Sequence, residues 1–108
     1  MDSKDEILNK LASLPTYQLD TMRDKVQLRL RNILHKYHKS KDAEFVYRHE
    51  LRTKLLSEGI SYSKAELMLR ADQKLYELKR EIMKLSTERK ETELELEIIV
   101  NYFWKSKQ

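Results

Sequence analysis

The chain has 108 residues and a net charge of +4, with one Gly, one Pro, no Cys and 37% charged residues. So little Gly and Pro argues against β-sandwiches and nucleotide-binding α/β folds, and it favours one long-helical domain. The lack of Cys excludes disulfides and thiolate chemistry. No stretch approaches the roughly 20 apolar residues of a membrane span, and residues 1–5 lack the layout of a secretory signal, so we expect a cytoplasmic protein.

The first two predicted elements are a short helix over 1–15 and a long helix over 16–57. Ile7, Leu8, Leu11 and Leu14 form the apolar face of the first, which Pro15 ends. The second is continuous or mildly kinked, and a short break near Ser40 is the alternative. Its apolar positions step by three and four residues, with a gap at 39–42: Leu19, Met22, Val26, Leu30, Ile33, Tyr37, Ala43, Tyr47, Leu51 and Leu55.

A turn over 58–62 and a helix over 63–108 complete the chain. Gly59 favours the left-handed conformation that closes a helix, and Ser63 with Glu66 forms the pattern of a capping box. Nothing after Ser63 predicts a break. The helix carries a narrow apolar stripe, interrupted by Arg89 and Thr92, at Met68, Ala71, Leu75, Leu78, Ile82, Leu85, Leu96, Ile99 and Phe103.

Such a stripe repeats every seven residues on average and predicts pairing with another helix. We therefore expect an all-α fold, in which a short N-terminal helix precedes two long helices in a helical hairpin or coiled-coil-like arrangement. The whole chain, 1–108, forms a single elongated domain. Pairing within one chain and pairing between chains stay open at this stage. The positions expected to mediate homo-oligomerisation are Leu75, Leu78, Ile82, Leu85, Leu96, Ile99, Phe103 and Trp104.

Positive charge is concentrated in 16–57, which has ten Lys or Arg against five Asp or Glu, whereas residues 63–105 have nine of each. Such a helix can follow a phosphate backbone, with affinity that falls as salt rises. The alternative is that acids of the last helix, such as Glu88, Glu91 and Glu95, neutralise it. The candidate nucleic-acid-binding residues are Arg23, Lys25, Arg29, Arg31, Lys36, Lys39, Lys41, Arg48 and Arg52.

Aromatic residues lie near this charge. Tyr37, Phe45 and Tyr47 are interspersed among the basic residues, and Tyr102, Phe103 and Trp104 are consecutive. Aromatic rings that stack on unpaired bases, beside cations that hold phosphates, are typical of single-strand binders. Packing between subunits is the alternative for the C-terminal group.

The sequence contains none of the residue patterns that are typical of catalytic sites. His35 and His38 share a helix face but have no third metal ligand at suitable spacing. There is no Gly-rich phosphate loop and no Ser on a strand-to-helix elbow. We therefore expect a non-enzymatic protein with no metal and no cofactor.

The last 45 residues carry a resemblance to a known family. Ser63-Lys64-Ala65-Glu66-Leu67, Ala71-Asp72, a helix rich in Leu and Glu, and the ending 96–105 resemble small phage recombination mediators of the UvsY-like type. The resemblance implies a helical, ring-forming protein that binds single-stranded DNA and helps to load a recombinase onto DNA coated by single-strand-binding protein. It also implies the host cytoplasm as the location.

Two functions therefore remain as hypotheses. The first is an oligomeric, non-catalytic protein that binds single-stranded DNA or RNA and has a recombinase or a single-strand-binding protein as partner. The second is a coiled-coil adaptor, assembly chaperone or inhibitor that binds another protein and no nucleic acid. They differ in whether the basic side chains are free or occupied by acids of the last helix.

Overall fold

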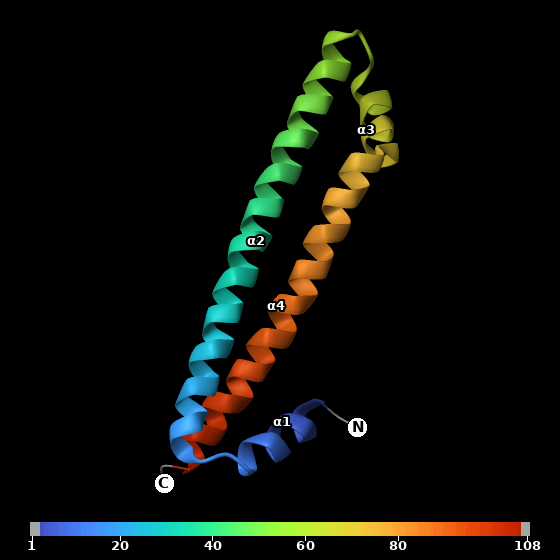
Figure 1. Cartoon of the computed structure of the whole chain (residues 1–108). Coiled ribbons are helices and arrows are strands. Elements are labelled where there is room, and N and C mark those ends of the chain that lie inside the picture. The colour runs from blue at the N-terminus through green and yellow to red at the C-terminus, as the bar shows by residue number, and fades with distance from the viewer. Residues whose placement is uncertain (1–2, 107–108) are drawn as a thin grey trace. The chain divides into compact units, whose positions relative to one another are not determined.

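The computed structural model describes residues 3–106, which form four α-helices and no strand (Figure 1). The all-α class predicted from the sequence is confirmed. Among the residues described, no helix has an apolar stretch long enough to cross a bilayer. The helices are α1 (Ser3–Ala12), α2 (Thr16–Ser57), α3 (Tyr62–Ala71) and α4 (Gln73–Ser106).

α1 ends earlier than the predicted stop at Pro15. The backbone N–H groups of Ser13 and Leu14 bond to the carbonyls of Lys10 and Leu11 at 3.3 and 3.2 Å, in three-residue steps that tighten the chain. The Ser13 hydroxyl also donates to the Lys10 carbonyl at 2.8 Å. Because Pro15 disfavours helical geometry in the residue before it, the helix closes one turn ahead of the proline.

α2 is continuous over its 42 residues, so the alternative of a break near Ser40 is wrong. The apolar stripe does not resume at Ala43, which is exposed, but passes through Glu44, which is buried. Position 44 lies seven residues after Tyr37 and so keeps the same helix face. The Glu44 carboxylate lies 3.5 Å from the Arg48 guanidinium one turn later. This ion pair supplies the buried acid with a partner.

Gly59 ends α2 as the sequence predicts. Its φ of 85° is the left-handed conformation. The Ile60 N–H bonds to the Leu55 carbonyl at 3.2 Å, and the Gly59 N–H bonds to the Leu56 carbonyl at 3.1 Å. These two bonds form a Schellman motif, which satisfies carbonyls that the helix end would otherwise leave without donors.

The predicted capping box at Ser63 is wrong, because α3 is capped by Ser61. Ser61 has extended backbone angles, and its hydroxyl accepts the Lys64 N–H at 3.3 Å. Glu66, which would complete the box, instead accepts a hydrogen bond from Arg52 of α2 at 2.7 Å. Glu66 therefore bonds to another helix instead of forming the hydrogen bond that a capping box requires.

The predicted uninterrupted last helix is also wrong, because Asp72 separates α3 from α4. Asp72 has extended angles (φ −71°, ψ 124°), and its carboxylate accepts the Leu75 N–H at 2.8 Å, as the N-cap of α4. The break changes which face of α3 is covered. Ala65 and Leu69 are buried, whereas Met68 and Ala71, which the predicted stripe included, are exposed.

Contacts divide the described chain into two compact units. The first contains α1, α2 up to Leu34 and α4 from Thr87 onward, coloured blue and red in Figure 1. Ile7, Leu8 and Leu14 are partly buried against its core, so α1 and the segment after it help to cover the two longer helices. The buried core residues are Leu11, Leu19, Val26, Ile98, Ile99 and Phe103.

The second unit, His35–Ser86, contains the rest of α2, all of α3 and the beginning of α4, coloured green to orange in Figure 1. Polar contacts connect α2 to later parts of this unit: Arg52 bonds to Glu66, and Tyr47 bonds to Asp72. Tyr47 precedes Arg52 in α2, whereas its partner Asp72 follows Glu66, the partner of Arg52. The two segments therefore run antiparallel. The buried apolar residues are Leu55, Ala65, Leu69, Leu75 and Leu85.

Candidate nucleic-acid interface

Two predicted nucleic-acid-binding arginines of the first unit are engaged by carboxylates. The Arg23 guanidinium lies 3.3 Å from Asp20 and 3.7 Å from Asp24, and it also lies over the Phe103 ring, 5.3 Å from the centroid. Arg29 forms an ion pair with Glu95 of α4. Both cations therefore have partners within their own unit.

The two predicted arginines of the second unit are engaged in the same way. Arg48 pairs with Glu44, and Arg52 donates from Nε to Glu66 at 2.7 Å. This bond, together with the charge of Arg52, outweighs desolvation and holds the pKa of Glu66 below its usual range, because the cation stabilises the ionised form. Arg52 thereby joins the end of α2 to α3.

The other five predicted residues form a distinct group on α2. Each of them is exposed, and none forms an ion pair with any residue that the structure describes. Lys41 also lies over the Tyr37 ring, with its Nζ 5.3 Å from the centroid. We call these residues the α2 basic group: Lys25 and Arg31 in the first unit, and Lys36, Lys39 and Lys41 in the second.

The acids of α4 neutralise the positive charge of α2 only in part. Of those that could do so, Glu95 reaches Arg29, whereas Glu93 pairs with Arg89 of its own helix at 3.0 Å. Glu88, Glu91 and Glu95 line a shallow groove with Arg29 and Ile33 in the first unit. The acids thus gather around Arg29 and leave the α2 basic group exposed.

The predicted oligomerisation residues fall into three classes of exposure. Leu75, Leu85, Ile99 and Phe103 are buried within the single chain, and Leu78, Ile82 and Leu96 are half-buried. Trp104 is exposed. The structure places most of the stripe in contacts inside each unit, and among these eight residues Trp104 has the largest free surface. Their role between subunits stays a prediction.

Sequence reasoning missed a polar cluster around Asp72. The Tyr47 hydroxyl donates to Asp72 at 2.8 Å, and the Lys74 ammonium lies 4.7 Å from the centroid of the Tyr47 ring. The hydrogen bond from the Leu75 N–H, then that from Tyr47, lowers the pKa of Asp72 below its usual range, while the bond to Asp72 raises the pKa of Tyr47. The signal available was Asp at a possible N-cap, three residues before Leu75.

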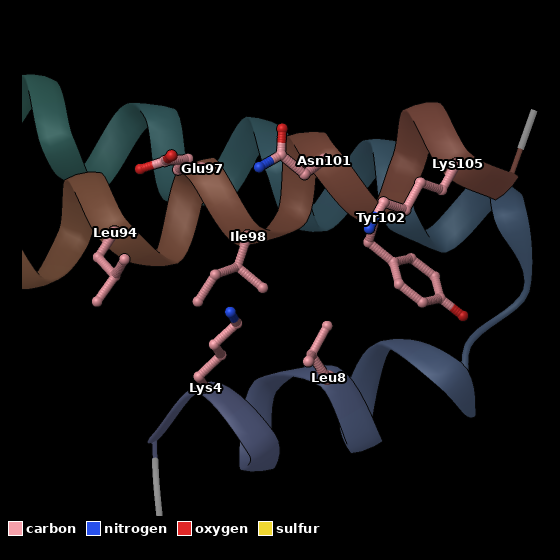
Figure 2. A pocket seen from close by; sticks show the side chains of 8 residues that line it. All are labelled: Lys4, Leu8, Leu94, Glu97, Ile98, Asn101, Tyr102 and Lys105. Atoms are coloured by element: carbon pink, nitrogen blue, oxygen red, sulfur yellow. The ribbon is translucent and has the colours of Figure 1, made fainter.

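A groove of about 330 Å³ lies between α1 and α4 in the first unit. Figure 2 shows Lys4 and Leu8 of α1 pointing toward α4, and Ile98 and Tyr102 of α4 pointing toward α1. Its lining combines apolar and charged side chains. The remaining lining residues are Leu94, Glu97, Asn101 and Lys105.

Comparison of the chain with protein-family models, with curated proteins and with solved structures finds no match. Across residues 3–106, no three His, Asp or Glu side chains converge where a metal ion could bind. The candidate interface therefore stands on its own geometry and charge.

Proposed function

We propose that this chain is a non-catalytic protein that binds single-stranded nucleic acid through the α2 basic group. One observation carries the proposal: of the nine cations predicted to bind, four arginines form ion pairs, and the other five are exposed without ionic partners in the described part of the chain. A cation already paired with a carboxylate must exchange that partner to bind phosphate. An exposed, unpaired cation exchanges only water and counterions.

The resemblance of the last 45 residues extends this proposal to its biological setting. We infer a preference for DNA over RNA, a role in loading a recombinase onto coated single strands, and self-assembly in which the exposed Trp104 takes part. Pairing of the two long helices as a hairpin within one chain belongs to the same proposal. It is supported by the links from α2 to later helices, Arg29 with Glu95 in one unit and Arg52 with Glu66 in the other.

The test is fluorescence anisotropy of a labelled single-stranded oligonucleotide, titrated with the protein at several salt concentrations. For five phosphate contacts, the logarithm of the affinity should fall with the logarithm of salt with a slope of about −3.5, since single strands give about −0.7 per contact. Replacing Lys36, Lys39 and Lys41 with Gln should reduce the slope to about −1.4.

The matched control replaces Lys79, Lys84 and Lys90 of α4 with Gln. These lysines are also exposed, and both triple variants lower the net charge by three. Circular dichroism checks that both keep their helix content. An unchanged slope in the control supports binding at α2, whereas equal losses in both variants would mean that net charge alone attracts the strand. Absence of binding at the lowest salt would remove nucleic acid from the proposal.

A second function, binding of a partner protein, is favoured by the groove between α1 and α4. Its apolar lining, which includes Leu8 and the exposed Leu94, is of the kind that receives an amphipathic helix, and Lys4 and Lys105 add positive charge to the lining. If the protein binds no oligonucleotide, the binding of a partner protein in this groove becomes the favoured function.

A further inference from the structure

We propose that Phe45 and His49 of α2 form a stacking platform for an unpaired base of the bound strand. This inference rests on the proposed function and adds to it a site for the base, where the α2 basic group accounts only for phosphates. The site lies wholly within the second unit.

The two rings are arranged as a platform. Phe45 and His49 are one helical turn apart, so they project from the same side of α2. Their planes differ by 4° and their centroids are 6.4 Å apart. Phe45 is 60% exposed and His49 is also exposed. An approaching base therefore meets exposed aromatic surface on this side of α2.

The position of Phe45 does not serve the core. Glu44, the preceding residue, is 9% exposed, so a carboxylate takes the buried position and an aromatic ring takes the exposed one. Interchanging the two would suit folding better, because burial of a Phe side chain is favourable and burial of a carboxylate is costly. The observed order leaves a large apolar surface on the face that carries free cations.

Charges beside the platform suit a nucleotide. The Arg48 guanidinium lies 5.9 Å from the Phe45 centroid and stays near Glu44. Lys41, four residues before Phe45, shares its face of the helix and is exposed without an ion pair among the described residues. A base on Phe45 would place its phosphate near Lys41. Stacking of this kind tolerates any base, because every base has a π-face.

The experiment compares two oligonucleotides of equal length, one with bases and one with an abasic backbone, against the full chain and its variants. Phe45→Ala should weaken binding of the base-bearing strand about 5- to 150-fold and leave binding of the abasic strand unchanged. Phe45→Trp should bind the base-bearing strand at least as well as the parent. The control is Tyr76→Ala, which removes a similarly exposed aromatic ring from α4.

The remaining outcomes show whether the stacking platform alone fails or whether the proposed function fails as well. If the parent binds neither strand, the proposed function fails and the platform fails with it. If the parent binds and Phe45→Ala binds the base-bearing strand equally well, only the platform is overturned. Equal losses for both strands, or a lower sedimentation mass of Phe45→Ala, would assign Phe45 to folding or to a protein contact and also overturn the platform.

Discussion

At the scale of single residues, Asp72 separates α3 from α4. Its carboxylate caps α4 through the Leu75 N–H and accepts the Tyr47 hydroxyl from α2. An Asp inside a long helix is only mildly unfavourable, so its own propensity does not force a break. The hydrogen bond from Tyr47 adds a reason for the side chain to face inward, where it can also cap the next helix.

The charge of Asp72 should make stability depend on pH. Its pKa is lowered in the folded state, so its stabilising contribution is present above the pKa of the unfolded chain and is lost as pH falls through the folded pKa. We expect stability to urea, followed by circular dichroism, to fall progressively as pH is lowered below about 5. Asp72→Asn keeps a capping oxygen but cannot titrate, so its stability should change less with pH.

Glu66 contributes to the same loss, because its pKa is lowered by Arg52. Glu66→Gln is therefore the companion variant, and the double variant should have the flattest profile. A parent and an Asp72→Asn variant with identical pH profiles would show that this carboxylate contributes nothing as an anion.

Polar residues on the apolar stripe find partners close by. Thr92 is buried, and its hydroxyl donates to the Glu88 carbonyl at 2.7 Å, one turn earlier in α4. Glu44 is buried beside Arg48. Among the described residues, no buried side-chain nitrogen or oxygen lacks a hydrogen-bond partner. The interruptions of the stripe are therefore satisfied within their own helices.

At the scale of helices, the ends of the elements depend on single side chains. The turn between α2 and α3 joins the Schellman motif at Gly59 to the cap at Ser61. Ser63, which the sequence predicts as the cap, and Ser61, which caps α3, are both exposed. α3 takes Ser61 as its cap, and Glu66, which would complete a capping box at Ser63, is bound to Arg52.

This choice has a direct test. Ser61→Ala should destabilise the protein by about 0.5–1 kcal/mol, because the Lys64 N–H loses its acceptor. Ser63→Ala should change the free energy of unfolding by less than about 0.5 kcal/mol, as for an ordinary surface position. Urea unfolding of both variants at neutral pH measures the difference. The reverse order would restore the capping box that the sequence alone suggests.

At the scale of the whole molecule, apolar burial in the first unit joins segments from both ends of the described chain. Leu11 of α1, Val26 of α2 and Ile99 of α4 meet in one core. Each helix alone would expose its apolar face to water, so the stability of each depends on the others. Ile99 is fully buried there, whereas Leu94 on the same helix is 53% exposed.

Ile99→Ala should therefore destabilise the protein by about 2–5 kcal/mol, the usual range for a buried Ile or Leu replaced by Ala. Leu94→Ala removes a side chain of the same size and should cost less than about 0.5 kcal/mol, because it lies at the surface. Thermal and urea unfolding compare the two. Similar losses for both would mean that Leu94 is covered in solution, for instance by a partner in the groove beside it.

The local pattern of the sequence determined the helical class, the end of α2 at Gly59 and most of the apolar face of each long helix. These features depend on residues within about four positions of one another, and helix hydrogen bonds and side-chain spacing act over that range. The tertiary structure alone decided the pairing of Arg29 and Arg52, whereas Arg23 and Arg48 pair with acids three or four residues away on their own helix. Arg29 meets Glu95 across 66 positions, Arg52 meets Glu66 across 14, and Tyr47 meets Asp72 across 25. A stripe that repeats every seven residues permits several registers between helices, so these pairings cannot be read from spacing. The final register of each unit, set by packing, brings Arg29 and Arg52 to their acids and leaves the α2 basic group exposed.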